Sequence, residues 1–492
     1  MVNFTSTPLT PVRRAPAPDG AMPHFRSISV KVRPGTAAKV GQTAFELVEQ
    51  IIIFIAIAAF FGVSGFSSEQ KLGQSEIVNT LALSSVLAFT LPVAFYYRKP
   101  AAQLLVKSPL LVIFLVISFF SVIWSQYPGL TLKRDGSLGV PILLALVVAC
   151  RHRTSDTIVT IGRFVLILSI LSAIVAILFP SVGQMTNREI FSETGNTVSM
   201  GEGLSGAWRG ITAHKNTLGY IVSVGFGIYF WRFCFEQKRR ALHLLICLFL
   251  CAVAYKARSA TSILAIVLYA VLLIVMLARR LPTRLRSLPE SLMFFGAIAS
   301  LAMLPIALKI VTTMMGKDLS LTGRVPLWGK AIEFIADAPF LGYGYGAFWV
   351  HGSPQVQAIY DMFQWEPPNA HNAYLELALE VGIPGAVVGT LILLSVIVRS
   401  YRLARSGGPS WTAFIAMFSI VFAFTNMADT LLLRMGDIYC FMLVLSQFAL
   451  VRYAQEQKQE PRSFNSRKFG QVTIGPTEPR VLKPGTSWLT GT

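Results

Sequence analysis

One histidine stands where the chain turns from a polar segment into an apolar helix, a position that suits chemistry. His371 lies in the stretch WEPPNAHNAYLE, residues 365–376. A neutral imidazole can deprotonate a hydroxyl group near pH 7. Because histidine is also common as a structural polar residue at a helix start, the rest of the sequence has to decide between a base and a structural residue.

Basic residues collect before two apolar runs. GAWRGITAHKNTLGY carries Arg209, His214 and Lys215, and YKARSATS carries Arg258. The amino terminus of a helix offers free N–H groups and the positive end of the helix dipole. Together these features predict a cationic pocket for an anion such as a diphosphate. Basic side chains at helix ends also anchor to lipid headgroups, and for Lys215 both interpretations are open.

The long segment 312–372 has an order of its own. GRVPLWGKAIEFIADAP predicts an amphipathic helix over residues 323–337. We expect Trp328, Ile332 and Ile335 to share one face of this helix, with the indole ring at the level of the lipid headgroups.

The stretch that follows, LGYGYGAFWV, alternates aromatic residues with Gly342, Gly344 and Gly346. This spacing is incompatible with a regular helix and predicts a close turn or the wall of a cleft. It does not match a phosphate-binding loop, because the GK[ST] ending and the preceding strand are missing.

The acidic residues and histidines of this region do not match a metal-binding spacing. The candidate ligands are His351, Asp361, Glu366 and His371. They form neither an HExxH motif nor a pair of carboxylates on one face. The sequence therefore predicts no metal and no cofactor. Glu376 and Glu380 lie one helical turn apart, which favours a polar contact between helices, although carboxylates inside a membrane also mark functional sites.

Composition places all these residues in a membrane protein. The chain of 492 residues is 53% hydrophobic and 14% charged, whereas soluble proteins contain about 25% charged residues. Apolar runs long enough to cross about 30 Å of hydrocarbon recur along it. We predict an all-α polytopic fold with about twelve transmembrane helices, the fourth extended from residue 129 onward. The spans are 46–66, 77–97, 109–124, 138–150, 157–179, 215–233, 241–255, 259–278, 291–311, 373–398, 410–428 and 434–452.

The basic residues set the orientation of these helices. Most Lys and Arg fall in alternate connecting segments and in both ends of the chain, which predicts that both termini lie inside the cell. His371 and the whole segment 312–372 then lie outside. The net charge of +19 follows from this topology and from anionic lipid headgroups, so no nucleic-acid partner is expected.

Five motifs follow one another along the chain. They are W-R-G-x-x-x-H-K-N from Trp208, S-A-T-S from Ser259, T-G-R-x-x-x-W from Thr322, P-F-L-G-Y-G-Y-G from Pro339 and A-H-N-A-Y-L-E-x-x-x-E-x-G-I-P-G from Ala370. In this order they resemble the O-antigen ligase and Wzy-type polymerase superfamily, and within it most of all the ExoQ-type exopolysaccharide polymerases. The resemblance covers about residues 110–450.

The resemblance implies a glycosyltransferase of the bacterial inner membrane with a GT-C-like helical architecture. Its donor would be a glycan carried on undecaprenyl diphosphate, used at the periplasmic face without a metal. By position, His371 matches the histidine that activates the acceptor hydroxyl. Arg209 and Arg258 match arginines that hold the diphosphate, and Arg324 matches the GR motif of the loop. Further substrate-binding candidates beside these are Lys215, His214 and Asn372.

The resulting organisation has five parts. They are a disordered basic cytoplasmic tail (1–45), transmembrane helices one to nine (46–311), a periplasmic loop with an amphipathic helix (312–372), transmembrane helices ten to twelve (373–452) and a second disordered tail (453–492). The expected partners are the lipid-linked glycan donor and acceptor, the bilayer, and a chain-length regulator and a flippase of the same pathway.

Two alternatives remain at this point. An O-antigen ligase would move the same lipid-linked polysaccharide to lipid A-core. His214 and Lys215 stand where ligases more often have proline and asparagine, which mildly favours the polymerase. A transporter of polysaccharide or lipid-linked sugar would be expected to carry internal repeats and midplane charges, which this sequence does not show. A base acting opposite the leaving diphosphate implies inversion at the anomeric carbon.

Overall fold

The computed structural model describes residues 36–60, 72–185, 206–212, 214–278, 324–363 and 366–459. These residues form α-helices and loops; over the same ranges the only strand-like pairing is an isolated bridge between Gln184 and Trp208. The chain falls into two units, Met1–Gln50 and Ile51–Thr492. The site described below lies in the second unit.

The helices follow one another with short connections. They are α1 (Thr36–Phe60), α2 (Leu72–Tyr96), α3 (Arg98–Val106), α4 (Pro109–Phe120), the 3-10 helix η1 (Ser121–Ile123), α5 (Pro128–Arg151), α6 (Thr154–Leu178), α7 (Pro180–Gly183), α8 (Lys215–Phe235), α9 (Arg240–Ala257), α10 (Ala260–Ala278), α12 (Arg324–Asp337), α13 (Pro354–Tyr360), α14 (Ala373–Arg405), α15 (Ser410–Thr425) and α16 (Ile438–Gln459).

The predicted spans overlap with these helices wherever the chain is described. Span 291–311 lies outside the described residues. Five described helices, α6, α8, α9, α14 and α16, are long and apolar enough to cross a membrane, or six if α2 and α3, which are bent by 93°, count as one span. The all-helical membrane fold is therefore confirmed, whereas the count of twelve stays a prediction.

Three predicted boundaries are wrong. Helix α1 begins at Thr36, inside the predicted tail, and α16 continues to Gln459, because the flanking Ala, Lys, Gln and Glu residues favour helix beyond the apolar run. At its other end α16 begins at Ile438 rather than at 434, so segment 426–437 is an irregular connection. That segment carries part of the site.

Helix α14 is broken near its start, where the sequence predicts a continuous span. Val381 and Gly382 have non-helical backbone angles, and Gly382 has φ +72°. The cause is Pro384, which has no N–H to donate and clashes with the carbonyl of Glu380 one turn earlier. That carbonyl instead accepts the N–H of Gly344 at 2.8 Å.

The glycine and aromatic stretch occupies this break. The N–H of Tyr343 donates to the carbonyl of Leu379, and the N–H of Ile383 donates to the carbonyl of Pro339, both at 2.8 Å. Gly342, Gly344 and Gly346 all have positive φ (64°, 101° and 67°), which confirms the predicted turn. The loop thereby satisfies backbone groups that the kink leaves without helical partners.

Helices α8 and α10 pack closely against each other near their first turns. A Cβ at Gly219 of α8 would lie 2.1 Å from the hydroxyl oxygen of Ser262 in α10, and one at Gly227 would lie 2.7 Å from the ring of Tyr269. Small residues at such positions let helix backbones approach closely. The starts of α8 and α10 are therefore held side by side, next to the end of α9.

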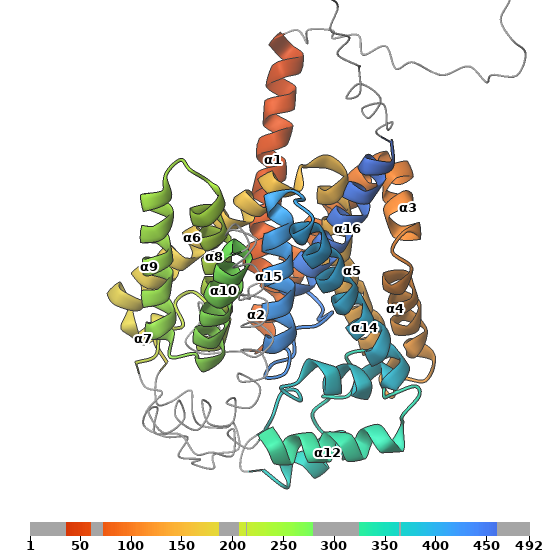
Figure 1. Ribbon diagram of the computed structural model, residues 1–492. Coiled ribbons are helices and arrows are strands. Elements are labelled where there is room, and N and C mark those ends of the chain that lie inside the picture. Colours follow the sequence, from red (N-terminus) through yellow and green to blue (C-terminus); the bar gives the residue numbers. More distant parts are fainter. Residues whose placement is uncertain are drawn as a thin grey trace, which may run out of the picture. The chain divides into compact units, whose positions relative to one another are not determined.

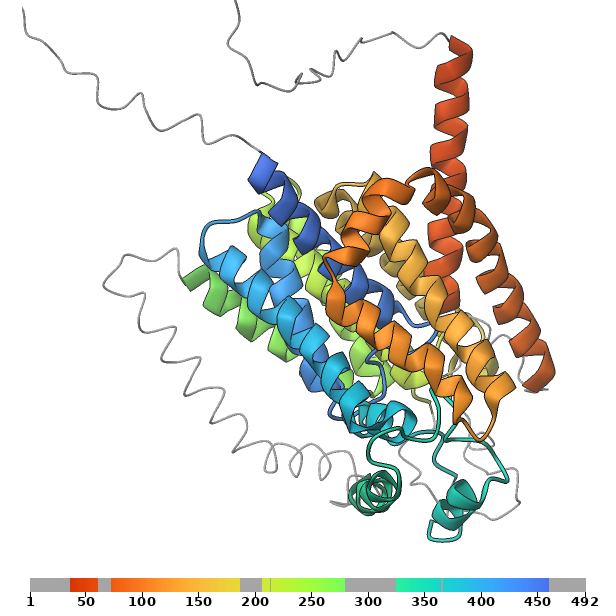
Figure 2. The same ribbon diagram turned by 90° about the vertical axis from the view of Figure 1, so that its right-hand side faces the viewer.

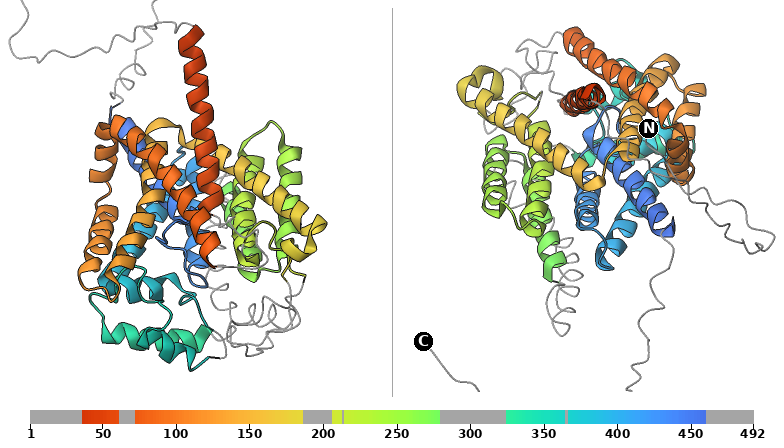
Figure 3. Two further views of the ribbon diagram at one scale, coloured as in Figure 1. Left: turned by 180° about the vertical axis from the view of Figure 1, so that it is seen from behind. Right: turned by 90° about the horizontal axis from the view of Figure 1, so that it is seen from above.

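The helices gather in three neighbouring groups within the second unit. Figures 1 and 3 show α8–α10 on one side of α14–α16, and α4 and α5 on the other, in agreement with the packing of α8 on α9 and α10, of α14 on α4, and of α16 on α5. Figure 2 shows α12 end-on beside the first turns of α14. We call the end of the helices at which α8 and α14 begin the site end.

Candidate active site

The backbone of His371 is held in a strained conformation at the site end. Its φ is +49°, in the left-handed region that histidine adopts more often than most residues but that still costs energy. Its N–H donates to Oδ1 of Asn369 at 2.9 Å, and the same oxygen accepts the Thr430 hydroxyl at 3.1 Å. Strain that neighbours enforce in this way is typical of functional positions.

The residue before His371 is clamped on both sides. The carbonyl of Ala370 accepts the indole N–H of Trp328 at 2.9 Å, and its N–H donates to Oε2 of Glu376 at 2.8 Å. Trp328 comes from α12 and Glu376 from α14. The backbone directly before His371 is thus held by two helices.

Asn372, and not His371, has the structural role at the helix start. The side-chain oxygen of Asn372 accepts the N–H groups of Tyr374 at 3.1 Å and Leu375 at 3.3 Å, and so caps α14. This cap already accounts for the side-chain oxygen of Asn372, which the sequence analysis assigned to substrate. The helix-start interpretation therefore does not explain His371.

The surroundings of His371 keep its imidazole neutral. Burial, followed by the nearby charges of Arg324, Arg434 and His214, lowers the pKa of His371 to about 4. The group is therefore deprotonated at neutral pH, which a base requires, although the low pKa makes it a weak one until an anion offsets those charges. The structure brings two predicted site residues, Arg324 and His214, to this histidine.

Arg434 was missed by sequence reasoning. It lies in the irregular segment before α16 and donates from Nη1 to the carbonyl of Thr430 at 3.1 Å. The apolar run LLL directly before it made residues 431–434 look like the start of a transmembrane helix. The available signal was a basic residue at the outer end of a predicted helix, followed by Gly436 and Asp437.

A cationic cluster made of Arg209, His214, Lys215 and Arg258 surrounds the start of α8. Arg209 is buried and donates from Nε to the carbonyl of Val182 at 2.7 Å. His214 is exposed and accepts the N–H of Asn216 at Nδ1, which caps the helix. Arg258 is exposed and follows α9 with φ +50°, rather than starting α10 as predicted.

Lys215 does not reach toward lipid. Its ammonium group is buried and donates to the carbonyl of Arg258 at 3.2 Å. This bond joins the first turn of α8 to the residue that ends α9. A second bond, from the N–H of Trp208 to the carbonyl of Lys256 at 2.9 Å, joins the Arg209 loop to the same turn. The cluster is therefore one connected structure.

The cluster and His371 are linked at two points. His214 belongs to the cluster and acts electrostatically on His371. The hydroxyl of Tyr220, in α8, contacts the carboxylate of Asp429, in the segment that carries Arg434. An anion held at the start of α8 would therefore lie near the groups that surround the imidazole.

Helix α12 forms as predicted, but with a different buried face. Leu327, Ala331 and Ile335 are buried, whereas Ile332 is 55% exposed. Trp328, Ile332 and Ile335 thus do not share one buried face, because α12 packs on α14 through residues spaced four apart. The placement of Trp328 at the headgroup level stays a prediction.

A cavity of about 130 Å³ is lined in part by Asn369, whose side-chain oxygen accepts the N–H of His371. Asn369, Glu376, Glu380, Arg134 and Arg434 contribute its polar lining, together with Trp349 and Gly346. Oε2 of Glu376 accepts the N–H groups of Trp349 at 2.9 Å and Ala370 at 2.8 Å. Glu376 and Glu380 of α14 also interact electrostatically with Arg134 of α5, in line with the polar contact between helices that the sequence predicts. Over the described ranges, no three His, Cys, Asp or Glu side chains converge as metal ligands.

Part of the chain is similar to known proteins. Residues 243–389 match a family described as O-antigen ligase. A curated relative, the exopolysaccharide production protein ExoQ of Rhizobium meliloti (strain 1021), is 30% identical over 200 residues. The resemblance to the O-antigen ligase and Wzy-type superfamily is thereby confirmed.

The extent of these matches is partial. The alignment with ExoQ covers 38% of this chain and 45% of the relative. The O-antigen ligase match spans Arg258, Arg324 and His371, whereas Arg209 and Arg434 lie outside it. The helical, apolar chain and its similarity to the O-antigen ligase family indicate a multi-pass membrane protein.

Proposed function

We propose that this protein is a glycosyltransferase of the bacterial inner membrane that polymerises oligosaccharide repeat units carried on undecaprenyl diphosphate. The periplasmic face would be the site of reaction and exopolysaccharide the product. The observation that carries the proposal is the position of His371: it is constrained by Asn369, neutral at pH 7 and surrounded by Arg324, Arg434 and His214. The similarity to the exopolysaccharide production protein supports the choice of product.

The proposed reaction is a single displacement. His371 accepts the proton of an acceptor hydroxyl, whose oxygen forms a bond to the anomeric carbon of the donor sugar. The bond from that carbon to the diphosphate oxygen breaks, and the electron pair leaves with undecaprenyl diphosphate. Arg209 and Arg258 hold the leaving group, with Arg324 beside it, because fixed guanidinium groups stabilise charge that develops in the transition state.

The charges around His371 couple the base to the donor. The free imidazole has a pKa of about 4 because burial and neighbouring positive groups oppose its protonation. A diphosphate bound among those groups offsets their charge, so the pKa of His371 rises once the donor is in place. Proton abstraction by His371 then becomes favourable only when the donor is bound, which would limit proton abstraction in the absence of donor.

The activity can be tested with purified protein in lipid vesicles. Supplied with repeat units linked to undecaprenyl diphosphate, the protein should make lipid-linked glycans of increasing length, with the new linkage inverted at the anomeric carbon. Retention of configuration in the product would rule out the single displacement. Absence of any elongated glycan, with released undecaprenyl diphosphate also absent, would rule out the polymerase.

The O-antigen ligase is a second candidate because residues 243–389 match the family of that name. It shares the donor and the base but uses lipid A-core as the acceptor. A deletion strain separates the two candidates. Loss of a polymerase leaves single repeat units on the lipid carrier, whereas loss of a ligase leaves long lipid-linked polymer that is not attached to core.

The topology belongs to the same proposal. With both termini in the cytoplasm, the starts of α8 and α14 face the periplasm, where the glycan donor and acceptor would meet. A chain-length regulator and a flippase of the same pathway are proposed partners. Reporter fusions placed after Gln459 and within residues 354–363 should report opposite sides of the membrane.

A further inference from the structure

The cavity that Asn369 lines carries ionisable side chains that have no role in the proposed reaction. Its volume of about 130 Å³ is many times the roughly 10–15 Å³ that one water requires. The ionisable lining residues are Arg134 of α5, Glu376 and Glu380 of α14, and Arg434. Of the described residues that line it, none belongs to the cationic cluster around α8.

The arginines present donors to the cavity. Where the chain is described, neither Arg134 nor Arg434 forms an ion pair with a carboxylate, although both interact electrostatically with Glu376 and Glu380. A Cβ at Gly346 would lie 2.6 Å from Cδ of Arg134. The glycine therefore leaves the space through which the guanidinium of Arg134 reaches the cavity.

The carboxylates are fixed as acceptors in the same space. Glu376 and Glu380 are 6% and 9% exposed. Glu376 is oriented by the N–H groups of Trp349 and Ala370, and Glu380 accepts the N–H of Gly346. Buried groups oriented by backbone and indole donors move little on binding, so the site exists before a ligand arrives.

This combination of donors, acceptors and an aromatic ring matches the chemistry of a sugar. A sugar hydroxyl both donates and accepts hydrogen bonds, so it can bridge a guanidinium and a carboxylate. Trp349 and Tyr345 supply apolar surface for the C–H groups of the ring. A cluster of acidic residues alone would favour a cation; paired arginines and an indole favour a polyhydroxylated ligand.

The location selects the acceptor rather than the donor. Asn369 lines the cavity and also holds the N–H of His371. A sugar in this cavity would therefore contact the residue that positions the backbone of the base, whereas the diphosphate of the donor would lie at the start of α8. We propose that the cavity binds the acceptor sugar that carries the attacking hydroxyl, with Arg134 and Glu380 as specificity-determining residues. This inference rests on the proposed function.

The test separates acceptor binding from donor binding. Rates are measured in vesicles with lipid-linked donor and, as acceptor, the free repeat-unit oligosaccharide released from the cell's own lipid carrier. Glu380→Gln and Arg134→Gln should each raise the KM for the acceptor about tenfold or more, the loss of one charge-assisted hydrogen bond. The KM for the donor should stay within about twofold of wild type. Glu333→Gln, an exposed carboxylate on α12, is the matched control and should change neither value.

Binding without catalysis provides the second measurement. Saturation-transfer NMR with the same oligosaccharide should show contact with the His371→Asn protein and loss of contact when Arg134→Gln is added. A rise in donor KM instead of acceptor KM, or unchanged acceptor KM and unchanged oligosaccharide contact in both cavity variants, overturns the subsite. Full activity of His371→Asn would instead refute the proposed function, so the two failures are distinguishable.

Discussion

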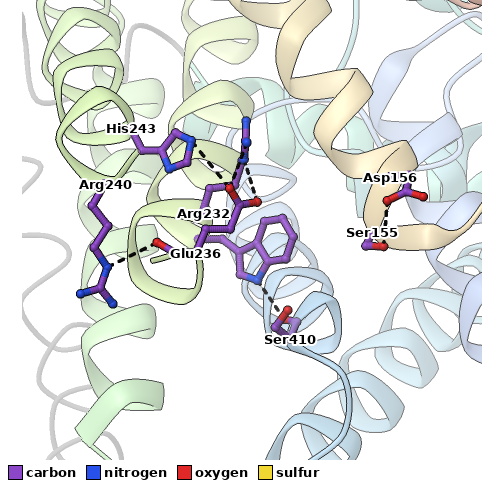
Figure 4. A network of polar contacts seen from close by, with 8 residues as sticks. Ser155, Asp156, Arg232, Glu236, Arg240, His243 and Ser410 are labelled. Atoms are coloured by element: carbon purple, nitrogen blue, oxygen red, sulfur yellow. Dashed lines mark hydrogen bonds and ion pairs between the residues drawn. The ribbon is translucent and has the colours of Figure 1, made fainter. Parts of the chain in front are cut away.

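Two regions of the molecule contain the same three residue types and use them differently. At the end of α8 remote from the site, Glu236 accepts both Arg232 Nε at 2.9 Å and Nη2 at 3.0 Å, and His243 Nε2 lies 3.8 Å from the same carboxylate (Figure 4). At the site end, His371, Arg434 and Glu376 lie close together, but the carboxylate is bonded to Trp349 and Ala370.

The difference lies in how the charges are balanced. In the first region the arginine and the glutamate satisfy each other, and the histidine of the next helix packs on the pair. Such a network joins the ends of two helices and leaves nothing for a ligand to neutralise. In the second region, N–H groups of neutral residues hold the carboxylate of Glu376, while Arg434 lines a cavity. Incomplete pairing, rather than residue type, distinguishes a binding site from a structural one.

A large effect on turnover is expected at Arg258, in the cationic cluster around the start of α8. Replacing it with alanine removes an exposed guanidinium from the cationic cluster and should lower the turnover rate about 10²- to 10³-fold, as the loss of a transition-state donor does. Arg240→Ala, at the other end of α9, should leave turnover unchanged. Elongation by equal amounts of vesicle-inserted protein is the measurement.

Lys215→Ala should mainly reduce protein abundance, since the ammonium group of Lys215 is bonded to a backbone carbonyl. Equally small losses of turnover in Arg258→Ala, Arg240→Ala and Lys215→Ala would refute a diphosphate pocket.

Asn369 and Asn372, on either side of His371, are expected to have different roles, and replacing them should have smaller effects on the rate. Asn369→Ala releases the backbone of His371 and should lower kcat about tenfold, because a misplaced base loses proximity, with the KM for the donor unchanged. Asn372→Ala removes the α14 cap and should cost about 1 kcal/mol of stability with a smaller change in kcat. Thermal unfolding and steady-state rates on the same preparations distinguish positioning from capping. A lower melting temperature with normal kcat in Asn369→Ala would contradict the positioning role.

The pH dependence of the rate should reveal the charges around His371. The active form is neutral, so kcat/KM should hold as the pH falls from neutral and be lost as it passes through the pKa of about 4 of the free protein. The acid limb of kcat should lie at a higher pH, because the bound donor raises that pKa. Arg434→Gln removes a positive neighbour and should move the kcat/KM limb upward as well.

Arg232→Gln is the matched control for this profile and should leave both limbs in place. The effect on stability should be the smallest of the series. Because Arg232 and Glu236 are partly exposed (15% and 35%), their ion pair contributes about 1 kcal/mol or less. A shift of the acid limb in Arg232→Gln as large as that in Arg434→Gln would show that long-range charge, and not the local set, controls the base.

Much of the fold could be predicted because its signals are local. The starts of α8 at Lys215 and of α14 at Ala373 agree with the predicted spans, since each follows a capping residue and opens a long apolar run. The start of α12 follows likewise from its amphipathic spacing. Apolar length identified α6 and α9 for the same reason.

The site could be predicted only in part because its contacts join distant segments. His371, Arg324 and His214 were named from the sequence, yet their neighbour Arg434 was hidden behind Leu431 to Leu433. Pro384 signalled a kink in α14, but no local rule says that Gly344 would supply the missing donor at 2.8 Å. The cavity is lined by five separate segments of the chain, so its lining could not be read from any one stretch.

The central claim, that His371 is the base and not a structural residue, is tested most directly by a matched pair of histidine variants. Asparagine tolerates the left-handed backbone at position 371, so His371→Asn removes the imidazole without adding strain. His243→Asn removes a buried histidine from its network with Arg232 and Glu236. Polymer formed per inserted molecule is measured for both. We expect a loss of about 10²- to 10⁴-fold for His371→Asn and wild-type polymer per molecule for His243→Asn. Normal polymer from stably inserted His371→Asn protein would contradict the account.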